Sequence, residues 1–127
     1  MIKMQWGIIM KFTKMHGAGN DYIYIDCFTQ DVENPEELSK KLSERHFGVG
    51  ADGIVLIKPS PVADCFMDIY NADGSRAKMC GNAIRCVAKY IYDNKKKKPV
   101  IKIDTLSGIK LVEVYTENGV VVGGKVN

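Results

Sequence analysis

Alternation of hydrophobic and polar residues predicts strands along much of the chain. In DYIYIDCF, residues 21–28, the isoleucines face one way and the tyrosines the other, which is the two-residue period of a strand. Further strands are expected at Met10–Lys14, at IVLIK (54–58), at DCFMDIYN (64–71), at VIKID (100–104), at IKLVEVY (109–115) and at VVVGGKV (120–126). TENG, residues 116–119, supplies the turn between the last two.

Two segments have the spacing of amphipathic helices. Asn34 can cap the first, Pro35 suits its first position and Glu37 completes a capping box. We expect this helix to end at Gly48. The second helix begins near Cys80, and apolar residues recur along it at helical spacing: Ala83, Ile84, Val87, Ala88 and Ile91. Strands interrupted by two helices predict an α+β fold with a mixed or antiparallel sheet.

Size and charge narrow the class of protein. A chain of 127 residues suits one domain with a modest core. The net charge of +3 is too small to indicate a nucleic-acid partner, and the lysine run 95–98 is expected to be a solvated loop. No segment is long enough to span a membrane, and no targeting signal is convincing. We therefore expect a cytoplasmic protein that binds neither nucleic acid nor membrane, with its cysteines as free thiols.

Candidate chemistry gathers in MCGNAIRC, residues 79–86. A zinc site or a redox pair would need thiols closer in sequence than Cys80 and Cys86, so no metal is expected. Cys27, Cys65 and Cys86 are expected to be small core residues. Cys80 differs because it directly precedes the first helical turn, where unpaired backbone N–H groups and the positive end of the macrodipole favour a thiolate.

The residues after Cys80 extend this site. Gly81 and Asn82 offer backbone N–H groups to an anion such as a carboxylate. A thiolate beside a carboxylate-binding helix end is a catalytic arrangement. The other glycine-rich loop, GVGADG at 48–53, precedes a strand rather than a helix, which excludes a dinucleotide-binding site.

The chain resembles the diaminopimelate epimerase family in four segments: KFTKMHGAGNDYIYID, RHFGVGADGIVLI, YNADGSRAKMCGNAIRC and IDTLSGI. They occur in the family's order and cover residues 10–127, so residues 1–9 would be an N-terminal extension. The resemblance implies a curved mixed sheet, or barrel, wrapped around a central helix, and an enzyme without a cofactor. Family chains contain two such halves, so residues 10–127 would be the N-terminal domain, with the second domain absent.

The resemblance also implies a reaction. Family enzymes interconvert LL- and meso-2,6-diaminopimelate, in the biosynthesis of lysine and of peptidoglycan precursors, by two-base proton transfer between two cysteines. Cys80 matches the first catalytic cysteine, Gly81 and Asn82 match the residues that hold the carboxylate, and Asn20 and Asn71 match substrate-binding asparagines. The second cysteine belongs to the missing C-terminal half, so this part alone is expected to be inactive.

Some alternatives stay open. The chain could belong to a related cofactor-independent racemase for histidine or proline, or be a non-catalytic binding module of the same fold. Asn20 and Asn71 could be turn residues that bond their own backbone. Some family members carry glutamine where this chain has Gly53, so one polar contact with the substrate could be missing. A half-molecule could also pair as a homodimer through its exposed cleft face.

Overall fold

A computed structural model describes residues 2–3, 9–17 and 19–127 of the chain. The helices are α1 (Pro35–Ser43) and α2 (Gly81–Asn94). The strands are β1 (Ile2–Lys3), β2 (Ile9–Met10), β3 (Thr13–Gly17), β4 (Asn20–Asp26), β5 (Gly53–Lys58), β6 (Cys65–Asn71), β7 (Arg76–Ala77), β8 (Val100–Thr105), β9 (Gly108–Glu117) and β10 (Val120–Val126).

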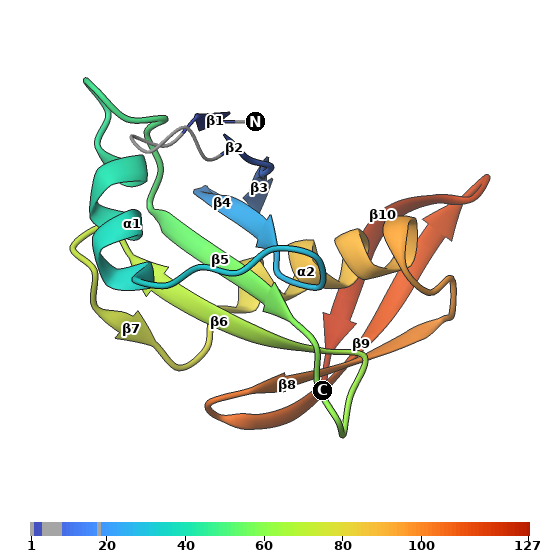
Figure 1. Ribbon diagram of the computed structural model, residues 1–127. Coiled ribbons are helices and arrows are strands. Elements are labelled where there is room, and N and C mark those ends of the chain that lie inside the picture. The colour runs from blue at the N-terminus through green and yellow to red at the C-terminus, as the bar shows by residue number, and fades with distance from the viewer. Residues whose placement is uncertain (1, 4–8, 18) are drawn as a thin grey trace.

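The main sheet has the strand order β10-β9-β8-β6-β5-β4-β3, with β7 paired to β6. The neighbours β4 and β5 are parallel, as are β6 and β8, and the other pairs are antiparallel. Helix α2 contacts β3 and β4 near one edge of the sheet and β8, β9 and β10 near the other, so the sheet curls around it (Figure 1). Helix α1 packs on the opposite face, against β5 and β6. The expected α+β fold, a curved mixed sheet around a central helix, is confirmed.

The two helices create a hydrophobic core on each face of the sheet. On β4, Tyr22 and Tyr24 belong to the core under α2, whereas Ile23 and Ile25 belong to the core under α1. The predicted alternation is therefore correct, and both of its faces are buried. The four apolar side chains of β5 divide between the same two cores, which explains its unbroken hydrophobic run.

The predicted strand Met10–Lys14 is wrong in its bounds, because β2 forms a separate two-stranded sheet with β1, whereas β3 belongs to the main sheet. Lys11 makes its backbone hydrogen bonds with a side chain instead of a strand. Its N–H donates to Gln30 Oε1 at 2.8 Å, and Gln30 Nε2 donates to the Lys11 carbonyl at 3.1 Å. β2 pairs with β1, and β3 pairs with β4. Of the expected extension 1–9, residues 2–3 and 9 lie in strands, and the rest lies outside the described residues.

Helix α1 starts as predicted and ends earlier than predicted. The Asn34 side chain accepts the N–H of Glu37 at 3.5 Å. The helix ends at Ser43 rather than at Gly48, because the backbone turns extended at Glu44 and the Glu44 carboxylate takes the next N–H groups. Gly48 closes this turn by donating to the Glu44 carbonyl at 3.0 Å. An added Cβ at Gly48 would overlap backbone carbonyl oxygens of α1.

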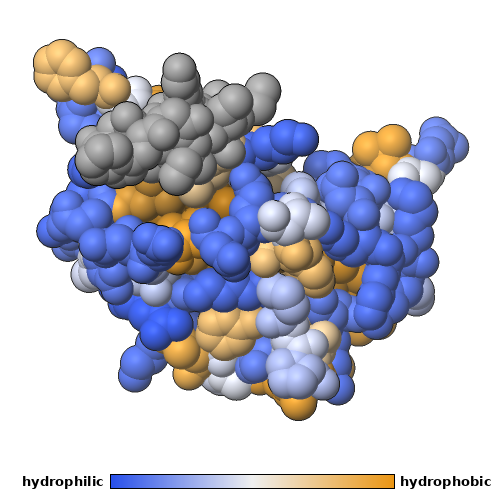
Figure 2. Space-filling view, in the orientation of Figure 1, coloured by the Kyte–Doolittle hydropathy of each residue, from blue (hydrophilic) through white to orange (hydrophobic). Residues whose placement is uncertain are grey.

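The β9–β10 hairpin has the turn that TENG predicts. Asn118 and Gly119 both have positive φ, 54° and 80°. Two successive residues of this kind form the two-residue turn whose twist matches that of paired strands. Val120 and Val122, just after the turn, are exposed. The space-filling view has a hydrophobic patch at the tip of this hairpin and mainly hydrophilic residues around it (Figure 2).

The lysine run after α2 bonds to the body of the protein. Lys95 pairs with Asp26 at 2.8 Å, and Lys96 and Lys98 both pair with Asp64, at 3.3 and 2.8 Å. These pairs tie the loop to the ends of β4 and β6 and neutralise much of its charge. Neither helix of the described segments has the length and apolar character needed to cross a bilayer.

Candidate active site

Three neighbouring strands bring polar positions to one end of the sheet, on the face that α2 covers. In the register of β4, β5 and β6, Tyr22 lies opposite Gly53, and Gly53 lies opposite Asn71. Tyr22 faces α2, so Asn20, two residues earlier on β4, faces the same side. Asn71 likewise shares a face with Ile69, which packs under α2. Asn20, Gly53 and Asn71 thus face the same core.

Cys80 is the N-cap residue of α2, directly before Gly81. Its backbone is extended, with φ −144° and ψ 118°, and its carbonyl accepts the first helical hydrogen bond from the N–H of Ile84 at 2.9 Å. The side chain makes no capping hydrogen bond to the helix. The N–H groups of Gly81 and Asn82 precede that first bond, so they have no partner within the helix. A half-buried thiol and these donors therefore share the N-terminus of α2.

Tyr22 contacts the thiol from the sheet. Its hydroxyl donates to Cys80 Sγ at 3.9 Å, a long hydrogen bond of the kind sulfur makes. The ring is only 5% exposed. Burial raises the pKa of Tyr22, and the nearby Cys80 raises it further, so the phenol stays protonated and remains a donor. Sequence reasoning missed Tyr22. Its place two residues after Asn20 puts it on the same face of the strand, but the sequence gives no sign of its contact with Cys80, 58 positions away.

Asn82 and Asn20 join the helix to the same strand. Asn82 Nδ2 donates to Asn20 Oδ1 at 3.5 Å, across 62 positions of sequence. Of the predicted site residues, the structure thus brings Asn20, Cys80, Gly81 and Asn82 together at the N-terminus of α2. Their juxtaposition creates a polar cluster at one end of an otherwise apolar core.

Asn71 is held by its own turn. Its N–H donates to the Ser75 carbonyl at 2.7 Å, and its side-chain Nδ2 donates to Ser75 Oγ at 3.1 Å. These are the contacts of a turn residue. A substrate contact with Asn71 would have to compete with Ser75 for the amide group.

Gly53 has no room for a side chain. An added Cβ would overlap the carbonyl oxygen of Tyr70 on β6. The backbone as it stands therefore excludes a glutamine here, and any polar contact such a residue makes elsewhere in the family must come from another residue.

A cluster of charges holds the loop that precedes β5. Asp21 pairs with Lys14 at 3.0 Å and with Arg45 at 3.2 Å, and Arg45 also reaches Asp52 at 3.4 Å. Hydrogen bonds from Lys14 and Arg45 lower the pKa of Asp21 to about 2. The Asp52 carboxylate accepts the N–H of Asp21 at 3.0 Å. Asp21, the residue after Asn20, is therefore bonded both to β3 and to the loop before β5.

The other cysteines lie in or beside the cores. Cys65 is fully buried, and burial raises its pKa to about 12. Cys27 is half-buried against the core under α1, and burial raises its pKa to about 11. Cys86 is buried on α2, and its thiol donates to the His16 carbonyl at 3.7 Å. Among the described residues, no group of three His, Cys, Asp or Glu side chains is arranged to hold a metal ion.

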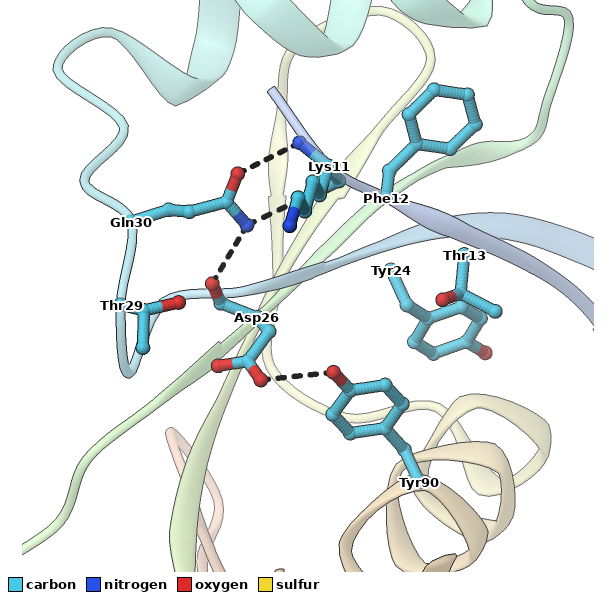
Figure 3. A pocket seen from close by; sticks show the side chains of 8 residues that line it. All are labelled: Lys11, Phe12, Thr13, Tyr24, Asp26, Thr29, Gln30 and Tyr90. Carbon is cyan, nitrogen blue, oxygen red and sulfur yellow. Dashed lines mark hydrogen bonds between the residues drawn. The ribbon is translucent and has the colours of Figure 1, made fainter. Parts of the chain in front are cut away.

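A hollow of about 240 Å³ lies between β3, β4 and the later part of α2 (Figure 3). Tyr90, one of its lining residues, is ten positions after Cys80, or about 15 Å along a helix. The Tyr90 hydroxyl donates to Asp26 Oδ2 at 2.8 Å, and Gln30 bonds to the backbone of Lys11 and Asp26. The hollow is therefore distant from the site around Cys80. Its polar groups already bond to one another, so it also differs from that site in chemistry.

Comparison with known proteins gives one family. Residues 12–127 match the family model described as diaminopimelate epimerase. A protein of Methanococcus maripaludis named diaminopimelate epimerase is 61% identical over 119 residues, which are 93% of this chain and 43% of that protein. One of the same name from Acetivibrio thermocellus is 59% identical over 111 residues, 87% of this chain and 40% of that protein. The chain thus spans about two fifths of the length of these relatives.

Solved structures with a similar fold have other names. A probable proline racemase from Agrobacterium radiobacter, solved with bound carbonate, superposes with a TM-score of 0.75 at 17% identity, over 93% of this chain and 41% of that one. A hydroxyproline epimerase from Agrobacterium vitis, solved with bound trans-4-hydroxy-L-proline, gives 0.73 at 14% identity, over 97% and 42%. At these identities the likeness concerns the fold.

Proposed function

Because the chain belongs to the diaminopimelate epimerase family, an isomerase family, we propose that it supplies one half of a site that interconverts LL- and meso-2,6-diaminopimelate. The proposal places the enzyme in the synthesis of lysine and of peptidoglycan precursors. Residues 10–127 would be the N-terminal of two domains, which agrees with the 43% of the Methanococcus maripaludis relative that the chain matches. The four free thiols suit a cytoplasmic enzyme.

Cys80 is the acid–base group of this half. The α-proton of an amino acid is very weakly acidic, so its removal needs a positioned base and stabilisation of the developing negative charge. The Cys80 thiolate takes the α-proton and becomes a thiol. A second thiol, which we assign to the other half of the complete site, gives a proton to the opposite face of the same carbon. The carbon inverts, no electrons are gained or lost, and no cofactor takes part.

The N-terminus of α2 would hold the reacting carboxylate. Backbone N–H groups of Gly81 and Asn82 point out of the first turn, and the helix dipole adds positive potential there. Both effects stabilise the carboxylate as negative charge moves onto it during proton removal. Asn20 and Asn71, on the adjacent strands, are the proposed contacts for the rest of the substrate, and their amides can donate and accept.

One observation carries the proposal. A half-buried thiol begins α2 without capping it, and Asn82 of the same helical turn bonds to Asn20 of the sheet. A cysteine that only filled space would not require this polar surrounding. The identity of 61% to a protein named diaminopimelate epimerase supports diaminopimelate, rather than proline or histidine, as the proposed substrate.

The test is exchange of the α-proton with heavy water. The protein is a chimaera in which residues 10–127 replace the matching part of the Methanococcus maripaludis relative. We expect proton NMR to show loss of the α-proton signal of LL- and meso-diaminopimelate, and Cys80→Ala to abolish it. Cys27→Ala, which removes another half-buried thiol, should retain it.

Three results would contradict the proposal. They are no exchange with diaminopimelate, exchange that survives Cys80→Ala, and faster exchange with proline or histidine than with diaminopimelate. The chain on its own should invert almost nothing, because one base cannot act on both faces of a carbon. Rapid inversion by the isolated chain would reject the assignment of the second base to another part of the protein.

A further inference from the structure

We propose that Tyr22 is a positioning residue for Cys80, whose hydroxyl holds the sulfur at the N-terminus of α2 and stabilises it as a thiolate. The starting observation is the hydrogen bond from the Tyr22 hydroxyl to Cys80 Sγ at 3.9 Å. It is the side-chain partner that the described residues offer to Cys80. The mechanistic meaning of this contact rests on the proposed function, whereas the contact itself does not.

The sheet fixes the Tyr22 hydroxyl. In the ladder, Tyr22 pairs with Met15 on β3 and with Gly53 on β5, so its backbone is bonded on both sides. Its ring stands edge-on to the Tyr24 ring, with centroids 6.3 Å apart, and is 5% exposed. A side chain held in this way has little freedom to lose when it forms a hydrogen bond.

Cys80 has no comparable restraint of its own. Its side chain does not cap α2, and it lies at the junction between a short loop and the helix. The sulfur could take other rotamers about its single side-chain torsion. The Tyr22 contact selects the rotamer that points toward the sheet, where Asn20 and Asn82 also meet.

A hydrogen bond to a charged acceptor is stronger than one to a neutral acceptor. The Tyr22 O–H therefore stabilises the thiolate of Cys80 more than the thiol. Burial raises the pKa of Tyr22 above its ordinary value, so the phenol keeps its proton over the range in which a thiol ionises. The other titratable groups that act on this pair are Tyr24 on β4 and Asp52 before β5.

Tyr24 provides a matched control. It is two residues from Tyr22 on the same face of β4, and it is 2% exposed. Burial raises the pKa of Tyr24, and Cys86 raises it further, more than Cys80 does. Tyr22→Phe and Tyr24→Phe thus each remove one hydroxyl from a buried tyrosine, and only the first hydroxyl bonds to Cys80.

The experiment measures the rate of Cys80 alkylation by iodoacetamide as a function of pH, with the modified peptide identified by mass spectrometry. A hydrogen bond to a charged group is worth enough to move the midpoint of this profile by about one pH unit. We expect Tyr22→Phe to move it upward by about that amount, which lowers the rate at pH 7 several-fold. Tyr24→Phe should leave it in place, and circular dichroism should show both variants folded.

A second replacement of Tyr22, with the opposite expected shift of the midpoint, keeps the test valid if Tyr22→Phe fails to fold. Replacement of Tyr22 by 3-fluorotyrosine retains the ring and makes the hydroxyl a stronger donor, so the midpoint should move to lower pH. The proposal is overturned if folded Tyr22→Phe keeps the original midpoint, if Tyr24→Phe shifts it equally, or if the fluorinated variant moves it upward.

This test and that of the proposed function can fail separately. Alkylation needs no substrate, so a Tyr22-dependent profile would stand even if the chimaera exchanged no diaminopimelate proton. Conversely, proton exchange that depends on Cys80 together with an unchanged Tyr22→Phe profile would reject the role of Tyr22 alone.

Discussion

At the scale of single residues, Cys80 occupies a position that favours other side chains. Ser, Thr, Asp and Asn are preferred where a helix begins, because a side-chain oxygen accepts an N–H of the first turn. α1 has such a cap in Asn34, whereas the Cys80 side chain caps nothing. The first turn of α2 therefore retains its donors for another acceptor, and the helix forgoes the stability that a cap provides.

This difference gives a prediction for Cys80→Ser. A serine hydroxyl can cap α2, so we expect the free energy of unfolding to rise by about 0.5 to 1 kcal/mol relative to Cys80→Ala. The same substitution should remove proton exchange in the chimaera, because a hydroxyl is a far poorer acid–base group near neutral pH than a thiol. Urea denaturation of both variants measures the first effect. Equal or lower stability of the serine variant would show that the backbone at position 80 cannot use a cap.

Contacts between residues far apart in the sequence could not be predicted from the sequence. The helical position of Cys80 and the neighbours Gly81 and Asn82 followed from spacing alone. The Tyr22 contact did not, because it joins residues 58 positions apart, and only the curl of the sheet around α2 brings them together. The closed backbone at Gly53 was equally hidden, since it depends on the carbonyl of Tyr70 in the next strand.

At the scale of elements, patterns with a strict period were reliable. The alternation in β4 and β6 and the helical spacing in α2 placed each buried face correctly, because a one-residue shift in a strand would move every side chain to the opposite core. Ends of elements were less predictable. α1 stops at Ser43 because Glu44 takes backbone donors, and β2 and β3 separate because Gln30 pairs with Lys11. Both are side-chain-to-backbone bonds that leave no periodic signal.

The ion pairs that join Asp21 on β4 to Lys14 on β3 and to Arg45 in the loop before β5 predict a dependence of stability on pH. Lys14 and Arg45 hold the pKa of Asp21 at about 2, below its ordinary 3.8. The folded state thus favours the ionised carboxylate, and this contribution is complete above about pH 4 and is lost as pH falls toward 2. With allowance for solvent at this surface, it amounts to about 1 kcal/mol.

Asp21→Asn tests this. Urea unfolding should find the variant about 1 kcal/mol less stable than the original chain at pH 6, and the gap should close by about pH 2. Lys40, whose pair with Glu37 is exposed on α1, offers a control. Lys40→Gln should change little at either pH. A gap between Asp21→Asn and the original chain that persisted at low pH would assign its cause to packing instead of charge.

At the scale of the whole molecule, one sheet carries two cores. β4, β5 and β6 contribute alternate residues to the core under α1 and the core under α2. Because the same strands supply both cores, loss of one core would destabilise the strands that support the other. The described part of the chain should consequently unfold as one cooperative unit.

Core truncations on each face test this cooperativity. Leu38→Ala removes side-chain volume under α1, and Ile84→Ala does so under α2. Each should lower the free energy of unfolding by about 2 to 4 kcal/mol. Far-ultraviolet circular dichroism and tyrosine fluorescence should report the same single transition in both variants. Two transitions, or a variant in which only one probe shifts, would mean that the cores are independent.

The proposed chemistry depends on a reactive thiol at Cys80, at the N-terminus of α2. The most direct measurement is the alkylation rate of all four cysteines of the chain against pH, with each modified peptide identified by mass spectrometry. We predict that Cys80 is alkylated fastest at neutral pH. Cys27 and Cys65 should lag, because burial raises their pKa values to about 11 and about 12. Equal rates at all four positions, or a Cys80 that reacts only at alkaline pH, would contradict it.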